Sequence, residues 1–443
     1  MAHDTRLTCR NLVIYEVFVR NHGPSGTFAD VEADLERIRK LGVDVLWFMP
    51  IHPIGQLWRK GTLGCPYSVR DYWAINPEYG TAQDFRRLIE RAHECQMKVM
   101  MDMVFNHAAR DSDLVRDHLE WFHRGADGGP YRASQGWTDV VGFKHPHGDL
   151  SACLIDILKY WAAFGVDAFR CDVASLLPRE FWLDARRQAC GIRPDLLWMA
   201  ESVTIDFVAF ERAGGRHALS DCELYEAFDL TFDYDLWPIW QATVVGQVPV
   251  SRYLEMLRFQ DCIYPANYAK LRCVEHHDSL RIMALAATRA QALAWSAFQS
   301  FNKGAFLIYA GQEAAATRTP SLFDPDKIEW GGYELQPFLA RLAQLKKDPA
   351  ELAGQFVLVA AEPAIQAAWC HDAGLYGIFN VAGSAGETTV PLPDGVYCDL
   401  LNQADVAVRN GRLKVPEIAA ILRCHSKLDL KPVHSDLIDF RLA

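Results

Sequence analysis

Residues 165–175 read GVDAFRCDVAS, and residues 166–172 within them have the length and composition of a short β-strand. The residues before them have a helical pattern that ends at Gly165, so this part of the chain predicts a helix followed by a strand. Because side chains alternate along a strand, Arg170 and Asp172 would share a face with the apolar residues earlier in it. Two charges on such a face indicate either a structural ion pair or a functional site at the end of the strand.

The same alternation of strand and helix patterns runs through the first 350 residues. Short apolar runs alternate with amphipathic stretches such as 28–42 and 81–96. The strand candidates are residues 12–18, 43–50, 98–105, 166–172, 196–201, 223–229, 270–276 and 305–311. Eight strand-and-helix units predict an α/β fold whose parallel sheet closes into a (β/α)8 TIM barrel, with an open doubly wound sheet as the alternative. Because no glycine-rich phosphate loop opens any of the helices, a nucleotide-binding fold is disfavoured.

Two changes in this pattern predict the domain organisation. About forty residues rich in Gly, His, Asp and Trp separate the third strand from the next helix, which predicts a short excursion after strand 3 at about 108–149. Beyond residue 350 the apolar runs become short and β-like, and Asn410-Gly411 between two of them signals a hairpin. We therefore expect a barrel domain over residues 1–350 and a C-terminal all-β, sandwich-like domain over residues 351–443.

The composition is that of an ordinary globular chain, and it narrows the classes of partner. Half of the 443 residues are hydrophobic, 23% are charged and the net charge is −11 without any basic run, so nucleic acid is not an expected partner. The N-terminal residues lack the pattern of a signal peptide, and no apolar run approaches the roughly 20 residues of a membrane span. Twelve cysteines without a C-x-x-C pair are expected to be buried thiols. These features predict a cytoplasmic protein without a membrane partner, and they leave the oligomeric state open.

Charged and polar side chains stand where the predicted strands end. They are Asp102, Asn106 and His107 at the third strand, Arg170 and Asp172 at the fourth, Glu201 at the fifth, and His276, His277 and Asp278 at the seventh. Each of these residues alone is more often a helix cap, a loop tether or a structural histidine. In a parallel barrel, however, the carboxyl ends of all strands meet at one rim, where active sites lie. We therefore expect Asp172, Glu201 and Asp278 to share one pocket.

Three carboxylates with one arginine and two histidines suit the cleavage or transfer of an acetal. Glycoside cleavage needs one carboxyl group that protonates the leaving oxygen and a second that attacks or assists. Glu201 follows an apolar strand, which would desolvate it and raise its pKa, whereas the charge of Arg170 would keep Asp172 ionised. On this basis Glu201 is the predicted acid and Asp172 the predicted nucleophile. Asp278 is available to stabilise positive charge that develops on the sugar ring.

Other side chains are candidates for sugar binding. His107 and His277 can donate hydrogen bonds to sugar hydroxyls. Large aromatic side chains can serve as platforms for sugar rings, although most of them belong to the core. The tryptophans on or near predicted loops are Trp58, Trp73, Trp121, Trp137, Trp237 and Trp240. We expect two or three of them to line the cleft.

The chain resembles the α-amylase family of glycoside hydrolases and transglycosidases in four short motifs that occur in the family's order. The motifs are DMVFNH at 102–107, GVDAFRCDVA at 165–174, MAES at 199–202 and EHHDS at 275–279. The stretches GCPYSVRDYWAINPEYGT at 64–81 and GAFLIYAGQE at 304–313 are also similar to the family. The resemblance therefore covers essentially residues 12–425.

The resemblance implies a role for each matching residue. The implied catalytic residues are Asp172 (nucleophile), Glu201 (general acid/base), Asp278 (transition-state stabiliser) and Arg170, which orients and ionises the nucleophile. The implied substrate-binding residues are Tyr67, which would stack on the cleaved sugar, Asp102, His107 and His277. Asn106 would be a ligand if calcium is bound, and the further candidate ligands are Asp127, Asp139 and Asp149. His276 stands where the family usually has Asn.

The activity that the resemblance implies is hydrolysis with retention. Its bonds would be the α-1,4-glucosidic bonds of maltooligosaccharides or α-glucans, cleaved through a covalent glycosyl-aspartate intermediate without a required cofactor. An α-glucan transglycosidase of the 4-α-glucanotransferase type is the alternative, because it uses the same carboxylates. A catalytically inactive carbohydrate-binding relative is a remote alternative, since such proteins typically lose one of the three acids and all three are present here.

Overall fold

The computed structural model describes residues 5–131, 136–428 and 430. The chain forms two compact units, each built from several segments. The first unit comprises the residues up to Trp237 together with Tyr264–Arg281 and Gly304–Gln336. The second unit comprises Pro238–Ile263, Ile282–Lys303 and the residues from Pro337 onward.

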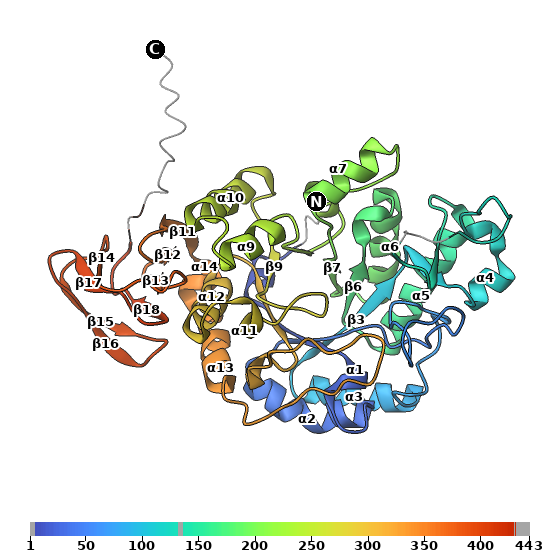
Figure 1. The fold of residues 1–443 in the computed structure, drawn as a ribbon, viewed down its shortest axis with the longest axis horizontal. Coiled ribbons are helices and arrows are strands. Elements are labelled where there is room, and N and C mark those ends of the chain that lie inside the picture. The colour runs from blue at the N-terminus through green and yellow to red at the C-terminus, as the bar shows by residue number, and fades with distance from the viewer. Residues whose placement is uncertain (1–4, 132–135, 429, 431–443) are drawn as a thin grey trace, which may run out of the picture. The chain divides into compact units, whose positions relative to one another are not determined.

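Eight parallel strands in the first unit close into a barrel, in which β3, β6 and β7 lie side by side (Figure 1). The strands are β1 (Val13–Val17), β2 (Val45–Phe48), β3 (Lys98–Val104), β6 (Ala168–Asp172), β7 (Leu197–Ala200), β8 (Leu230–Phe232), β9 (Lys270–Arg272) and β10 (Ala305–Tyr309). Around the barrel they follow one another in this order, and β10 pairs with β1. The predicted TIM barrel is therefore confirmed, and the open doubly wound sheet is excluded.

Helices and short 3-10 turns connect the strands of the first unit. The helices are α1 (Val19–His22), α2 (Phe28–Lys40), α3 (Ala82–Glu94), α4 (Asp113–Asp117), α5 (Gly148–Phe164), α6 (Arg179–Ile192), α7 (Ile205–Ala213) and α8 (Asp221–Leu224). The 3-10 turns are η1 (Leu7–Asn11), η2 (Leu119–Trp121), η3 (Ala174–Leu176) and η4 (Gln312–Ala314). The sequence signals are visible here: α2 buries its apolar stripe, and Thr81 and Asp84 form a capping box at the start of α3.

The prediction of the sixth barrel strand at residues 223–229 is wrong. Ser220 and Glu223 form a capping box that starts the one-turn helix α8, and the strand β8 begins only at Leu230. The apolar residues of this segment pack in a helical turn and the loop after it. A strand of three residues is too short to show a period in the sequence.

The excursion after β3 is a small substructure. β4 (His107–Ala109) pairs antiparallel with β5 (Val140–Gly142), and α4 and η2 lie between them in the chain. Residues 132–135 of the predicted excursion lie outside the described residues. The excursion's limits at about 108 and 149 remain a prediction.

The second unit combines helices with an all-β C-terminal part. The helices are α9 (Trp237–Val244), α10 (Val250–Ile263), α11 (Ile282–Leu285), α12 (Arg289–Phe301), α13 (Gln336–Leu345) and α14 (Pro349–Ala353), of which α9 and α13 begin with the last residue of a first-unit segment. A six-stranded sheet has the order β11 (Gln355–Ala360), β12 (Ile365–Cys370), β13 (Leu375–Phe379), β18 (Ala419–Arg423), β15 (Gly395–Asp399) and β16 (Ala404–Val408). The second sheet pairs β14 (Glu387–Thr389) with β17 (Arg412–Lys414), and both sheets contribute to one apolar core.

This arrangement confirms the predicted all-β C-terminal part. The predicted domain boundary at 350/351 lies within the second unit and remains a prediction. Residue 429 and residues 431–443 lie outside the described residues.

The Asn410-Gly411 signal produces a tight turn but not a regular hairpin. Both residues have positive φ angles, 54° and 66°, and Arg409 and Arg412 exchange two backbone hydrogen bonds across them. Beyond this bridge β17 leaves β16 and pairs with β14 instead. The local turn was thus predictable, whereas the partner of the strand was not.

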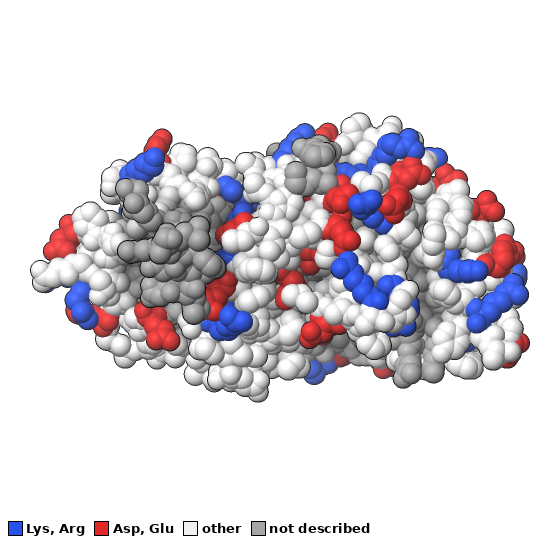
Figure 2. All heavy atoms as spheres, turned by 90° about the horizontal axis from the view of Figure 1, so that it is seen from above, with Lys and Arg blue, Asp and Glu red and all other residues white. Residues whose placement is uncertain are grey.

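On the face seen in Figure 2, basic and acidic side chains are interspersed. Among the described residues, none of the helices combines the length and the apolar composition that crossing a bilayer requires.

Candidate active site

The polar side chains at the strand ends converge at the rim of the barrel. β3 and β6 pair in a register that sets Asp102 beside Arg170, and both side chains are completely buried. Asp172 is the last residue of β6, and Glu201 directly follows β7. These positions follow from the parallel alignment, because neighbouring strands end at the same rim.

Arg170 lies at the centre of this cluster. Its Nη1 donates hydrogen bonds to Asp102 Oδ1 and Asp172 Oδ1, each at 2.8 Å, and its Nη2 lies 2.9 Å from Glu201 Oε1. One buried guanidinium thus contacts three buried carboxyl groups. A buried charge is costly unless it is paired, and one cation balances only one of three anions. The cluster therefore favours protonation of at least one carboxyl group.

Asp172 lines a pocket and has the features of a nucleophile. Its Oδ1 accepts the hydrogen bond from Arg170, whereas its Oδ2 is buried and has no hydrogen-bond partner among the described residues. Burial raises the pKa of Asp172 to about 6, and Arg170 counteracts this effect only in part. At neutral pH the group is therefore mainly ionised, although less firmly than the sequence argument from Arg170 alone predicted.

Glu201 has the features of a proton donor. Burial raises its pKa to about 7, with Arg170 opposing the shift and Asp172 adding to it. This direction agrees with the expectation from the apolar strand that precedes Glu201. Its Oε2 accepts a hydrogen bond of 2.7 Å from the backbone N–H of Val173, a β-branched residue held at φ 44°. The pKa of Glu201 is thus higher than that of Asp172. An acid and a nucleophile that share one site require this order.

Asp102 lies behind Arg170 and is not among the residues that line the pocket. Its Oδ2 accepts hydrogen bonds from Tyr67 Oη at 3.0 Å and from Trp47 Nε1 at 3.3 Å. Asp102 therefore contacts Arg170 and Tyr67, and its role in substrate binding remains a prediction. Tyr67 lines the pocket, and its stacking on the cleaved sugar remains a prediction.

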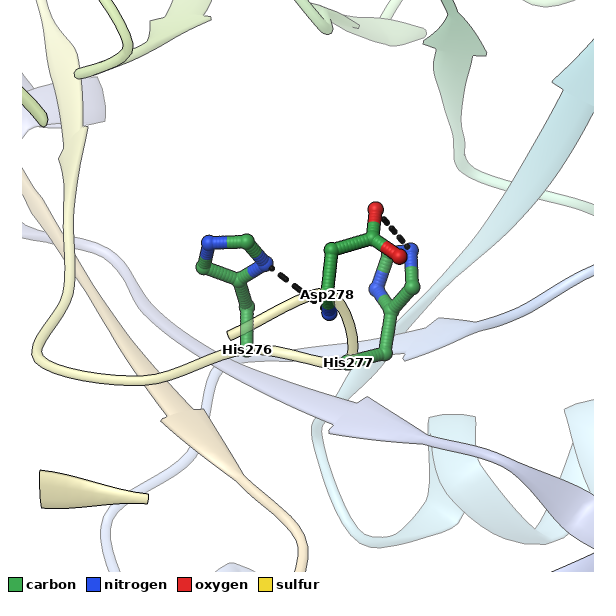
Figure 3. A group of neighbouring side chains, drawn as sticks. All are labelled: His276, His277 and Asp278. Carbon is green, nitrogen blue, oxygen red and sulfur yellow. Dashed lines mark hydrogen bonds and ion pairs between the residues drawn. The ribbon is translucent and has the colours of Figure 1, made fainter. Parts of the chain in front are cut away.

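His277 links the buried carboxylate of Glu16 to the pocket residue Asp278, and Figure 3 shows its contact with Asp278. Its Nδ1 contacts the buried carboxylate of Glu16, and its Nε2 lies 3.1 Å from Asp278 Oδ2 and 2.9 Å from Tyr67 Oη. Burial opposes its protonation, but Asp278 and Glu16 outweigh burial and raise the pKa of His277 well above its usual value. In turn, His277 holds the pKa of Asp278 well below its usual range despite burial. Asp278 therefore stays ionised where it lines the pocket.

His276 occupies the position where the family usually has Asn. Its ring packs against Tyr234 and Trp237, with ring centroids 5.5 Å and 4.9 Å away, and its Nδ1 accepts a hydrogen bond from the backbone N–H of Asp278 (Figure 3). Burial and the neighbouring His277 lower the pKa of His276 to about 3, so the ring is neutral. The His276 ring thus packs in an aromatic cluster, and its hydrogen bond holds the turn that carries Asp278.

His107 lies at the start of the excursion and lines the pocket. Tyr72 Oη donates a hydrogen bond of 2.7 Å to its carbonyl oxygen, and the ring of Trp137 lies 5.2 Å away. Burial lowers the pKa of His107 to about 4, so the side chain is neutral. A neutral imidazole can donate one hydrogen bond to a sugar hydroxyl.

The candidate calcium ligands make contacts within the protein, and calcium binding remains a prediction. Asn106 Nδ2 contacts His107 Nδ1, Asp139 pairs with Lys60 at 3.0 Å, and Asp127 Oδ1 accepts a hydrogen bond from the N–H of Gly129. In the described part of the chain, the group of His, Cys, Asp or Glu side chains that could hold a metal ion is His276, His277 and Asp278. Those side chains belong to the network described above, and no step proposed below uses a metal.

A pocket of about 240 Å³ lies at this rim. Five of the predicted site residues line it: Tyr67, His107, Asp172, Glu201 and Asp278. Of the six candidate tryptophans, Trp137 is the one that lines this pocket. The remaining lining includes Asp139, which the sequence offered only as a candidate calcium ligand, and Lys60, Leu322 and Phe323, which the sequence did not single out.

Glu16 is the site residue that sequence reasoning could have found. It is a completely buried carboxylate inside the apolar strand β1, the same conflict that drew attention to Arg170. With it, five carboxylates face two cations, Arg170 and His277. Such an excess of negative charge stabilises a cationic transition state, as in the opening of a glycosidic bond. Lys60 and Phe323 gave no comparable signal, because they lie in loops without a repeating pattern.

Comparison with known proteins agrees with this chemistry. Residues 16–137 match the family model described as the α-amylase catalytic domain, and residues 360–422 match the bacterial α-amylase C-terminal domain. The crystal structure of an α-amylase from Lactobacillus plantarum is 40% identical, covers 94% of this chain and all of its own, and superposes with a TM-score of 0.91.

Curated relatives include a hydrolase and a transferase by name. The α-amylase MalA of Haloarcula japonica is 27% identical over 81% of this chain and 52% of its own length. An α-1,4-glucan:maltose-1-phosphate maltosyltransferase of Rhodospirillum rubrum is 36% identical over 41% of this chain and 29% of its own length. The chain thus spans about half or less of the length of these curated relatives. From its barrel, its cluster of carboxyl groups at the rim and its similarity across nearly the whole chain, we conclude that the chain belongs to the α-amylase family of glucan-active enzymes.

Proposed function

We propose that the chain is a retaining glycosidase that hydrolyses α-1,4-glucosidic bonds of maltooligosaccharides or α-glucans. The observation that carries the proposal is the pair of unlike carboxyl groups at one pocket. Asp172 is mainly ionised with one oxygen unpartnered, and Glu201 has the higher pKa. A retaining mechanism needs such a pair, one group as nucleophile and the other first as acid and then as base.

In the first step the Asp172 carboxylate attacks C1 of the sugar, and the bond from C1 to the glycosidic oxygen breaks. Glu201 gives its proton to that oxygen, so the leaving chain departs as an alcohol and a glycosyl ester of Asp172 remains. In the second step the Glu201 carboxylate takes a proton from water, whose oxygen attacks C1 and releases Asp172. The ionised Asp278 lies at the same pocket and would stabilise the positive charge on the ring in both steps.

The transferase relative favours a second candidate, in which a sugar hydroxyl replaces water in the second step. Product sizing after incubation with maltooligosaccharides of defined length separates the two. Hydrolysis gives only chains shorter than the substrate, whether or not maltose is added. Chains longer than the substrate, increasing with added maltose, would establish the transferase instead. Intact substrates throughout would contradict both.

The pH dependence of kcat/KM should be a narrow bell. Asp172 must be ionised, so activity should fall below about pH 6, and Glu201 must be protonated, so activity should fall above about pH 7. Initial rates between pH 4 and 9 at low substrate concentration measure both limits. An acidic limb near the ordinary aspartate value of 3.8 would contradict the effect of burial on Asp172.

Arg170→Ala should move the acidic limb of this profile to higher pH. Without the guanidinium, burial and the neighbouring carboxylate of Asp102 would raise the pKa of Asp172 further. Arg170→Lys keeps a positive charge and should restore part of the shift. Arg187→Ala, which removes an exposed arginine of α6, is the matched control and should leave the profile unchanged. An acidic limb that stays in place in a folded Arg170→Ala protein would exclude this role.

A further inference from the structure

The loops after three neighbouring barrel strands are tied together at one side of the pocket. Arg20, whose side chain is only 4% exposed, lies in α1 directly after β1. Its Nη1 donates hydrogen bonds to the carbonyl oxygens of Gly64 at 3.0 Å and Leu322 at 3.1 Å, and its Nη2 donates to that of Leu63 at 3.3 Å. One buried guanidinium thus joins the loop after β2 to the loop after β10.

The same two loops are joined directly. The backbone N–H of Leu63 donates to the carbonyl oxygen of Phe323 at 2.9 Å. The N–H and the hydroxyl of Thr62 both donate to Asp324 Oδ1, each at 2.8 Å. At Gly61, with φ 58°, a Cβ would lie 2.7 Å from the Cβ of Phe323, so the approach requires glycine. Residues 60–64 and 322–324 form one closed structure, called the loop wall below.

The loop wall also reaches the excursion and lines the pocket. Lys60 Nζ lies 3.0 Å from Asp139 Oδ1 and donates to the carbonyl oxygen of Gly136 at 3.2 Å. Lys60, Leu322 and Phe323 all line the pocket that contains Asp172 and Glu201. A sugar in this pocket therefore meets the loop wall on one side.

The order of the strands around the barrel shows on which side of the pocket the loop wall lies, relative to Glu201. β7, which Glu201 follows, is four strands from β1 in either direction around the barrel. The loop wall extends from β2 and β10, the two neighbours of β1, so it lies across the barrel from Glu201. Because Glu201 would protonate the glycosidic oxygen, the leaving part of the chain lies on its side of the pocket. The opposite side receives the C4 end of the cleaved sugar, since C1 and C4 lie at opposite ends of a pyranose ring.

We propose that the loop wall closes the C4 side of the pocket, so that the chain cuts single glucosyl units from the non-reducing ends of α-glucans and does not cut in their interior. This inference rests on the proposed glycosidase function and adds its mode of attack. Lys60, Leu322 and Phe323 are the residues that determine the specificity. A glucan that continues past C4 would have to displace a structure held by Arg20, Thr62 and Asp324.

The test uses two p-nitrophenyl α-maltopentaosides. One has a free non-reducing end, and the other carries an ethylidene group across its terminal 4- and 6-hydroxyls. The full-length chain should cleave the free substrate and should cleave the blocked one at least about a hundredfold more slowly in kcat/KM. Comparable rates on both would overturn the end-specific inference while leaving the glycosidase function intact. Cleavage of neither substrate would overturn the proposed function itself.

Substitutions in the loop wall test the same inference by changing the protein instead of the substrate. Asp324→Ala removes both bonds to Thr62, and Phe323→Ala removes a lining side chain without touching those bonds. Either variant should raise the ratio of kcat/KM on the blocked substrate to kcat/KM on the free one at least about tenfold. Glu329→Ala, at an exposed position of the same loop, is the matched control. If the folded Phe323→Ala and Asp324→Ala proteins both keep the wild-type ratio of the two rates, the loop wall does not set the specificity.

Discussion

Asp172→Asn should reduce turnover of maltooligosaccharides by about four to six orders of magnitude, because the amide cannot form the glycosyl ester that the proposed mechanism needs. The variant should nevertheless fold. Steady-state rates on a p-nitrophenyl maltooligosaccharide, with circular dichroism on the same samples, measure both properties. Asp156→Asn, at an exposed position of α5, is the matched control and should keep full activity. Wild-type turnover in Asp172→Asn would exclude Asp172 as the nucleophile.

The same substitution should make the protein more stable at neutral pH. The pKa of Asp172 is raised in the folded state from 3.8 to about 6, so the ionised side chain costs stability above this range. A shift of that size corresponds to at most about 3 kcal/mol. The gain in the free energy of unfolding should appear between about pH 4 and 6 and be absent below pH 4, where the wild-type carboxyl is protonated in both states. Urea unfolding at pH 3.5 and pH 7.5 measures it, and a loss of stability at pH 7.5 would contradict the argument.

Glu201→Gln should lower turnover by about two to four orders of magnitude on substrates whose leaving group needs a proton. It should have little effect on the first step with an α-glucosyl fluoride, because fluoride leaves without a general acid. The second step still lacks its base, so the glycosyl ester on Asp172 should accumulate. Mass spectrometry of the intact protein should then show one added glucosyl unit.

Two controls support the interpretation of this experiment. The double variant Asp172→Asn, Glu201→Gln should show no added mass, since the acceptor carboxylate is missing. Glu180→Gln, at an exposed position of α6, should turn over both substrates like the wild type. A Glu201→Gln protein as active on maltooligosaccharides as the wild type would remove Glu201 from the acid role.

The sequence predicted the barrel and the meeting of the three acids because both follow from strict periodicities. Parallel strands that end at one rim bring Asp172 and Glu201 together, and the turn after β9 brings Asp278 to the same pocket. The short strand β8 was misplaced because residues 223–229 before it contain enough apolar residues to resemble a strand, whereas three residues are too few to show a period. The loop wall was not predictable, since the contacts of Arg20, Thr62 and Asp324 are hydrogen bonds between loops, which have no period in sequence.

Asp102 shows another limit of sequence reasoning. The motif identifies it as a site residue, but only the coordinates show that its oxygens are used by Arg170, Tyr67 and Trp47 and that it has no exposed surface. Likewise, the pKa of Asp172 depends on how deeply the carboxyl is buried, and burial outweighs the nearby guanidinium. The sequence gives the sign of each charge at a site, whereas the depth of burial decides how far the pKa of each group is shifted.

The left-handed backbone of Val173 has a consequence for engineering. A conformation at φ 44° costs a β-branched residue about 1–3 kcal/mol, and glycine would adopt it without that cost. Val173→Gly would therefore look attractive in any search for a more heat-resistant enzyme. The N–H at that position donates a hydrogen bond to Glu201 Oε2, however. A more flexible backbone at this position would weaken that hydrogen bond. The variant would therefore resist heat better but hold Glu201 less firmly in position for proton transfer.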